Sequence, residues 1–376
     1  MKAVTNVNIV LPDKIMRDGV VIFDEEIRDI RRISDIDEDS YELIDGKGGY
    51  LTPGLIDIHI HGSGGNDTME GSQESLSNIS QTVIEHGVTS FLPTTMTMRK
   101  DAIREALSSI KRAMDNGSDG ARILGTHMEG PFINPDYKGA QAEENIQQPT
   151  LELVKDFLDI IKIITLAPEM EGAGEFIEYI SRKGVVASIG HSSATFSQAK
   201  EAEKRGLDHA AHLFNAMTGL HHRKPGIVGA VLEGEMTCEL IADFIHIRPE
   251  VLRLVTKTKD PDKIILISDA MEAGGLEDGE YLLGGQKVYV NDGEARLADG
   301  TLAGSVLTLD QALRNMMNTA DLPLYKIVNM VTANPAQRLN IDHKIGKIQK
   351  GLDADLVLFD KEFSVKQVFV KGERKV

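Results

Sequence analysis

Eight short apolar runs decide the fold, the first four being residues 55–61 (LIDIHIH), 89–93 (TSFLP), 123–129 (ILGTHME) and 163–166 (IITL). The other four are 185–190 (VVASIG), 209–213 (HAAHL), 238–243 (CELIAD) and 264–269 (IILISD). Apolar runs of this length are typical of buried strands. Helical patterns lie between most of them, for example 72–87 (SQESLSNISQTVIEHG), 100–117 (KDAIREALSSIKRAMDNG) and 194–206 (ATFSQAKEAEKRG), and each of these ends at a glycine.

Strands that alternate with helices over about 220 residues predict a TIM-like (β/α)8 barrel of the α/β class. A doubly wound parallel sheet is the alternative. After the eighth run, residues 272–305 are rich in glycine and aspartate and predict a β-hairpin excursion. Two further helices are expected over 308–318 (TLDQALRNMMN) and 325–340 (YKIVNMVTANPAQRLN).

Both ends of the chain have strand character without a competing helical period. Short strands with turns are predicted over 4–12, 19–30 and 41–50, and again within 346–376. We therefore expect the two ends to meet in one small discontinuous β-sandwich. The predicted domains are 1–52 and 344–376 for the two parts of the sandwich, and 53–343 for the barrel.

Composition narrows the function classes. The chain has 376 residues, with 41 basic and 58 acidic side chains and a net charge of −17. This charge disfavours nucleic acid or an anionic membrane as a partner, and an anionic substrate would need a local cationic pocket. No apolar run reaches the roughly 18 residues of a transmembrane helix, and Asn6 and Asn8 interrupt any signal peptide. The single cysteine, Cys238, predicts a cytoplasmic protein.

Side chains that bind metals follow five of the eight predicted strands. They are His59 and His61, Glu129, His191, His212 and Asp269. Because catalytic groups lie at the C-terminal ends of barrel strands, these side chains are expected to meet at one rim. Imidazoles beside a carboxylate favour Zn or Fe over Ca or Mg. Taken singly, each residue could instead be a packing group, a cap or a solvated charge.

Seven motifs carry a family resemblance. They are PGLIDIHIHG (53–62), HMEGPFINPDYKGA (127–140), IGHSSAT (189–195), HLFNAM (212–217), HRKPG (222–226), ISDAMEAGG (267–275) and GTLAGS (300–305). Together they resemble the amidohydrolase superfamily and, within it, the N-acetylglucosamine-6-phosphate deacetylase family. HMEGPF and HLFNAM are specific to that family, whereas PGLIDIHIHG alone indicates only the superfamily.

The resemblance implies a role for each matching residue. Glu129, His191 and His212 would hold the primary divalent metal, and Asp269 would be the catalytic acid and base. Since His59 and His61 are kept here, a second metal site is available, so that one or two ions per subunit are expected. The substrate contacts implied by the family are Ala140, Asn215, Ala216, Arg223, His246, Leu302, Ala303 and Gly304. Gln141 departs from relatives that have a histidine there.

The implied reaction is deacetylation of N-acetylglucosamine 6-phosphate in amino-sugar catabolism and cell-wall sugar recycling. A relative acting on N-acetylgalactosamine 6-phosphate or on a cyclic amide, and a metal-free scaffold, are the alternatives. Arg223 lies in a cationic segment, 221–224 (HHRK), of an acidic chain, so this segment is either solvated or directed at an anion. The matching arginine of the family reaches a neighbouring subunit's phosphate site, which predicts a homodimer.

Overall fold

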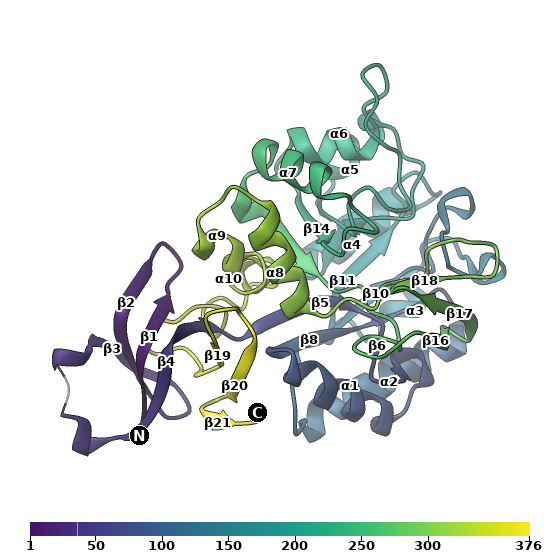
Figure 1. Cartoon of the computed structure of the whole chain (residues 1–376). Helices are drawn as coiled ribbons and strands as arrows, with labels where there is room; N and C mark the ends of the chain where they lie inside the picture. Colours follow the sequence, from purple (N-terminus) through teal and green to yellow (C-terminus); the bar gives the residue numbers. More distant parts are fainter. Residues whose placement is uncertain (36) are drawn as a thin grey trace.

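The computed structural model describes residues 1–35 and 37–376, and the predicted barrel forms the larger part of it, at the right of Figure 1. Its eight strands pair in parallel and in chain order: β5 (Leu55–Ile60), β8 (Val88–Thr95), β10 (Thr126–Glu129), β11 (Ile161–Leu166), β12 (Val186–Ile189), β13 (Leu207–Ala210), β14 (Thr237–Ile241) and β15 (Ile264–Ile267). The Asp269 amide donates to the His59 carbonyl oxygen at 2.9 Å and joins the two ends of the ring. Each of the eight predicted runs overlaps one of these strands.

The run 123–129 is divided into two strands. Residues 122–123 form a separate two-residue strand, β9 (Arg122–Ile123), beside β8. Gly125, with φ +148°, then turns the chain before β10 begins.

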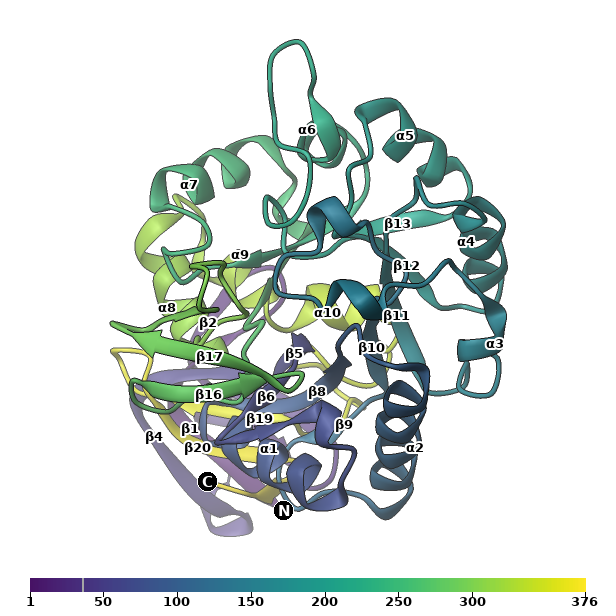
Figure 2. The same ribbon diagram turned by 90° about the vertical axis from the view of Figure 1, so that its right-hand side faces the viewer.

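Helices surround the barrel strands (Figure 2). They are α1 (Gln73–Glu85), α2 (Lys100–Asn116), α3 (Leu151–Val154), α4 (Ala173–Arg182), α5 (Phe196–Lys204), α6 (Gly226–Glu233), α7 (Pro249–Thr258) and α8 (Leu309–Thr319). In α1 the buried residues Leu76, Ile79 and Val83 recur at helical spacing, so that one apolar face packs against the barrel. Along the described chain, no helix is both long enough and apolar enough to cross a membrane.

The helix predicted over 325–340 is two helices instead. They are α9 (Leu324–Asn329) and α10 (Ala333–Arg338), and Thr332 between them has φ −136° and ψ −81°. Pro335 explains the break, because it has no backbone N–H and its ring would clash with the carbonyl group of Val331 in a continuous helix.

The two ends of the chain form one discontinuous sheet, as predicted. Its seven strands are β1 (Lys2–Val10), β2 (Ile15–Phe23), β3 (Ile27–Arg32), β4 (Glu42–Pro53), β19 (Leu356–Phe359), β20 (Val365–Val370) and β21 (Glu373–Arg374), in the order β21-β20-β19-β4-β1-β2-β3. Three strands separate β2 from β20 in this order, yet the rings of Phe23 and Phe369 are 5.3 Å apart. The sheet must therefore curl into a sandwich with its own apolar core. The domain boundaries themselves stay a prediction.

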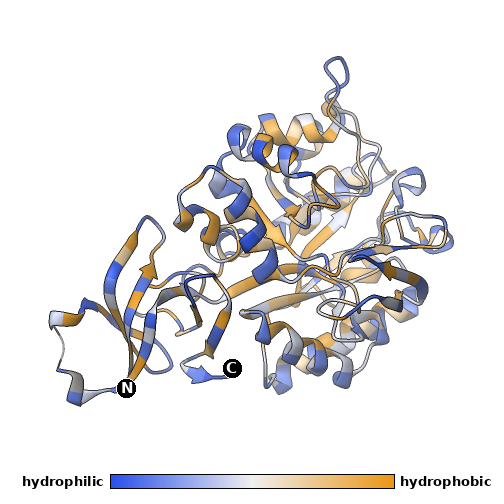
Figure 3. Cartoon of the chain, in the orientation of Figure 1, coloured by the Kyte–Doolittle hydropathy of each residue, from blue (hydrophilic) through white to orange (hydrophobic). Residues whose placement is uncertain are grey.

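Two smaller sheets lie at the barrel rim. The excursion after β15 has three antiparallel strands, β16 (Gly279–Leu283), β17 (Gln286–Asn291) and β18 (Glu294–Arg296), and β6 (Gly62–Ser63) pairs with β7 (Asn66–Asp67). Orange colouring along the barrel strands in Figure 3 shows that hydrophobic residues dominate them. The few polar side chains buried among them are therefore the candidates for function.

Candidate metal centre and substrate cavity

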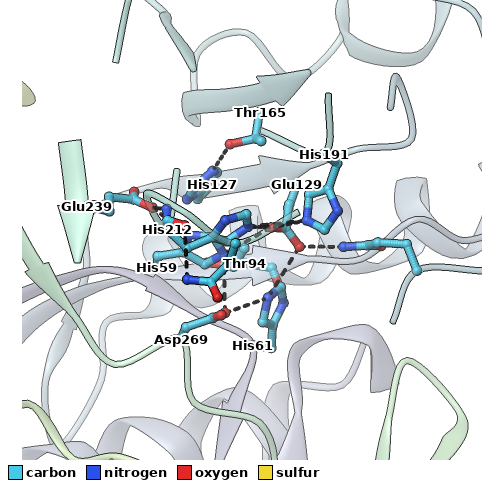
Figure 4. A network of polar contacts seen from close by, with 12 residues as sticks. His59, His61, Thr94, His127, Glu129, Thr165, His191, His212, Glu239 and Asp269 are labelled. Carbon is cyan, nitrogen blue, oxygen red and sulfur yellow. Dashed lines mark hydrogen bonds and ion pairs between the residues drawn. The ribbon is translucent and has the colours of Figure 1, made fainter. Parts of the chain in front are cut away.

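The structure brings together all six side chains that the strand ends predicted (Figure 4). Glu129 is at the centre of the cluster. Its Oε1 atom lies 3.0 Å from His191 Nε2, 2.9 Å from His212 Nε2 and 3.4 Å from His59 Nε2. Its Oε2 atom lies 3.5 Å from His61 Nε2. One carboxylate therefore contacts all four imidazoles.

Asp269 completes the cluster from the opposite side. Its Oδ1 atom lies 3.3 Å from His61 Nε2 and 3.5 Å from His59 Nε2. The ligand-type atoms of His59, His61 and Asp269 form one group within 4.8 Å, and those of His59, Glu129 and His212 form another. Two overlapping sets of donors thus lie in one buried site.

The chemistry of these donors fits a divalent metal. His191 Nε2 and His212 Nε2 lie 3.2 Å apart and face the same carboxylate oxygen, and His59 Nε2 is buried without a hydrogen-bond partner within the described ranges. Nitrogen atoms crowded in this way are stabilised when they share a cation. A mixed imidazole and carboxylate set matches Zn or Fe.

Hydrogen bonds on the far side of the rings orient three of the histidines. His191 Nδ1 lies 3.1 Å from the Tyr137 carbonyl oxygen, and His61 Nδ1 lies 3.3 Å from the Thr94 carbonyl oxygen. His59 Nδ1 lies 2.8 Å from Glu239 Oε2. A carbonyl oxygen can only accept, so His61 and His191 donate from Nδ1, which leaves each Nε2 lone pair directed into the site.

The backbone is strained where the chain enters the site. His191, His212 and Asp269 are each the second residue after a barrel strand, and their φ angles are +47°, +24° and +48°. Residues other than glycine rarely adopt this left-handed conformation, and such strain concentrates at functional sites. Here the conformation turns three side chains toward the barrel axis.

Electrostatics keep the central carboxylates ionised. Burial alone would raise the pKa of Glu129, but the surrounding histidines, His191 first, hold that pKa well below its ordinary value. The pKa of Asp269 is also lowered, because His59 and His61 outweigh the effect of burial. Both groups are therefore ionised carboxylates, the form that can bind a metal ion.

His127 shares this interior but is not a ligand. Its Nδ1 lies 3.0 Å from the Ile58 carbonyl oxygen and its Nε2 lies 2.7 Å from Thr165 Oγ1, so both ring nitrogens are occupied. Burial, reinforced by the nearby His59, lowers the pKa of His127 to about 3. The ring is neutral and packs inside the barrel.

A cavity opens directly over this cluster of histidine and carboxylate side chains. His61, Glu129, His191, His212 and Asp269 line it together with most of the predicted substrate residues, namely Ala140, Asn215, Ala216, His246, Leu302 and Gly304. Ala303 is buried between the last two. His246 Nδ1 lies 2.6 Å from Asp243 Oδ2, which fixes its ring at the cavity wall.

Arg223 is the one predicted contact that lies elsewhere. It is on the exposed loop that precedes α6 and projects from the barrel at the top of Figure 1. Its guanidinium group is 2.8 Å from Nε2 of the adjacent His222, and Arg223 does not line the cavity. Within one chain, this cation is therefore separate from the site.

Several residues of the site were not predicted from the sequence. Met96, Leu283 and Thr301 line the cavity, and Glu239 supports His59 from β14. An acidic residue inside the apolar run 238–243 was the available signal for Glu239. Gln141, whose role the sequence left open, donates from Nε2 to Glu129 Oε2 and accepts from the Thr97 amide at 2.7 Å.

Comparison with known proteins agrees with this geometry. Residues 50–375 match the amidohydrolase family. The chain is 42% identical to N-acetylglucosamine-6-phosphate deacetylase of Lysinibacillus sphaericus, over 89% of this chain and 88% of that one. It is 36% identical to N-acetylgalactosamine-6-phosphate deacetylase of Escherichia coli O157:H7, over 86% and 87%. The crystal structure of N-acetylglucosamine-6-phosphate deacetylase from Pasteurella multocida superposes with a TM-score of 0.94 at 31% identity, over 99% of both chains. The chain therefore belongs to the amidohydrolase family.

Proposed function

We propose that this protein is a metal-dependent amide hydrolase that converts N-acetylglucosamine 6-phosphate to glucosamine 6-phosphate and acetate. The observation that carries the proposal is the cavity in which Glu129, His191, His212 and Asp269 meet the residues expected to bind the sugar. Relatives with this activity are similar to the chain over most of its length. The reaction would serve amino-sugar catabolism and cell-wall sugar recycling in the cytoplasm.

The metal would be Zn or Fe. Glu129, His191 and His212 would hold the primary ion, and His59 and His61 would supply ligands to a second. When bound, such an ion supplies Lewis acidity, which polarises the acetyl carbonyl group and lowers the pKa of water from 15.7 to about 7. One or two ions per subunit are proposed.

Asp269 would move the proton. Its ionised carboxylate can accept a proton from the attacking water and return it to the amide nitrogen, which must be protonated because an amide anion is too basic to leave. Two features hold this carboxylate over the cluster: the left-handed backbone at Asp269, and the 2.9 Å hydrogen bond from its backbone N–H to the His59 carbonyl oxygen.

The sugar and its phosphate would occupy the rest of the cavity. Asn215 and His246 offer polar side chains, whereas Ala140, Ala216 and the turn Leu302–Ala303–Gly304 offer backbone groups and little bulk. Because Arg223 is exposed and does not line its own cavity, we propose that it reaches the phosphate bound by a second copy of the chain. The working unit would then be a homodimer.

A second candidate substrate is N-acetylgalactosamine 6-phosphate, which differs only in the configuration at one hydroxyl group. The relative of Escherichia coli O157:H7 that bears this activity in its name favours it as the alternative.

Acetate release tests the proposal. Purified protein is incubated with N-acetylglucosamine and N-acetylgalactosamine, each with and without the 6-phosphate, before and after metal chelation. We expect the highest kcat/KM on N-acetylglucosamine 6-phosphate, and loss of activity after chelation. Full activity in a preparation shown to be metal-free, or no acetate from any phosphorylated sugar, would contradict the proposal.

A further inference from the structure

Glu239 is a buried carboxylate behind the metal cluster, and it is next to His59 and His212 in Figure 4. Its side chain on β14 is 0% exposed. Oε2 lies 2.8 Å from His59 Nδ1 and accepts from the His212 backbone N–H at 3.1 Å, while Oε1 lies 3.1 Å from His209 Nε2. Three donors, from β5, from β13 and from the turn after β13, thus converge on one carboxylate.

These contacts determine how His59 faces the site. With the His212 amide and the His209 ring already donating to it, the carboxylate receives the Nδ1 proton of His59. The His59 Nε2 atom is then directed into the cluster, where it has no hydrogen-bond partner among the residues described. A ring fixed in this way is ready to bind a cation.

Glu239 contacts the two neighbouring ligands, His59 and His212, in different ways. Glu239 holds the imidazole ring of His59, but it touches only the main chain of His212. His212 therefore keeps its ring contact with Glu129 when Glu239 is changed, whereas His59 loses the group that orients it. A change at Glu239 should act selectively on the site to which His59 contributes.

Packing alone does not explain a charged group here. Barrel interiors are filled mainly by branched apolar side chains, and a buried carboxylate costs free energy even when it is hydrogen-bonded. A carboxylate at this position is understandable if its acceptor capacity is needed.

We propose that Glu239 is a positioning residue that makes His59 a competent ligand and so sets the affinity of the second metal site. The inference rests on the proposed metal-dependent function and adds to it a residue outside the predicted ligand set.

Metal titration of the E239Q variant tests this inference. The amide keeps the shape of the carboxylate but removes its charge, and it turns an NH2 group either toward His209 or toward both His59 Nδ1 and the His212 amide. Apoprotein is titrated with Zn²⁺ by calorimetry, and bound metal is counted by mass spectrometry after dialysis. We expect affinity for the second ion to fall by about 10–100-fold while the first ion stays bound.

Two further variants serve as controls for the E239Q measurement. H209Q can still donate to Glu239 and leaves the His59 contact intact, so it should retain both ions. H59Q removes the ligand itself and should retain one ion. If E239Q does not fold, E239D replaces it, because the shorter side chain keeps the charge but withdraws from His59; its affinity for the second ion should also fall.

The outcomes separate this inference from the proposed function. Unchanged second-ion affinity in E239Q, or in E239D where that variant is used, overturns the inference. Wild-type protein that binds a single ion also overturns it and leaves the proposed function intact. Wild-type protein that binds no ion overturns both.

Discussion

Replacing Asp269 by asparagine tests the proposed proton transfer without disturbing the fold. Asp269 has φ +48°, and asparagine tolerates this left-handed backbone as well as aspartate does. The main chain should therefore keep its bonds from the Asp269 amide to the His59 carbonyl oxygen (2.9 Å) and from the Ser305 amide to the Asp269 carbonyl oxygen (2.8 Å). Alanine would add strain and a void, so it is the poorer choice.

The expected loss follows from what the carboxylate does. Asparagine has nearly the same shape but cannot take up the proton, and positioned acid–base groups contribute about 10²–10⁴-fold to a rate. That range corresponds to about 2.7–5.4 kcal/mol of activation free energy. Since the lost interaction acts in the transition state, kcat and kcat/KM should fall by similar factors.

The assay is steady-state acetate release, with bound metal counted in the same preparations. D310N is a matched control, because Asp310 is also buried, at 6% exposure, but contacts His86 and Arg314 away from the cavity. We expect D310N to keep near-normal turnover. A D269N enzyme that retains its metal and a kcat within tenfold of wild type would refute the assignment of the proton shuttle to Asp269.

Three further predictions follow from other contacts. H212Q should lose the primary ion, since Glu129 Oε1 lies only 2.9 Å from His212 Nε2, and metal counting after dialysis checks this; an ion retained in full would contradict it. R223A and D269N, each nearly inactive alone, should partly recover activity when mixed under conditions of proven subunit exchange, because one pocket of each heterodimer is intact; no recovery would contradict a shared site. R122Q should cost about 3 kcal/mol of unfolding free energy at pH 7, as it leaves Asp355 buried without its cation. Burial already raises the pKa of Asp355 against the effect of Arg122, so protonation should make that cost smaller at pH 5, as denaturant unfolding at both pH values would show; an equal cost would contradict this.

The barrel was predictable because strand length and apolar composition are local properties. Each of the eight runs, such as 264–269, could be recognised without knowing its partners. The grouping of the candidate metal ligands was also predictable, since the C-terminal ends of parallel barrel strands meet at one rim. In contrast, the break at Thr332 comes from a single residue, Pro335, inside a stretch whose apolar spacing is otherwise helical.

The site residues that the sequence did not predict are those whose role depends on contacts between distant parts of the chain. The local signal for Glu239 is only an acidic residue inside an apolar run, and the three donors that define its role come from other parts of the barrel. Gln141 likewise finds Glu129 only through the fold of the loop after β10. The exposure of Arg223 depends on the path of a loop, and its proposed contact with a second copy of the chain lies outside any single chain.

The discontinuous terminal sheet affects how the protein is made on the ribosome. Strand β4 lies between β1 and β19, and about 300 residues separate β4 from β19 in the chain. At about 5–20 residues per second, the free edge of β4 waits roughly 15–60 s for its partner to be synthesised. During that interval β1–β4 present an unpaired edge and half of an apolar core, which is the condition that favours pairing with other chains. Slow translation or loss of the last 21 residues, which contain β19 to β21, should therefore cause aggregation before it impairs the barrel.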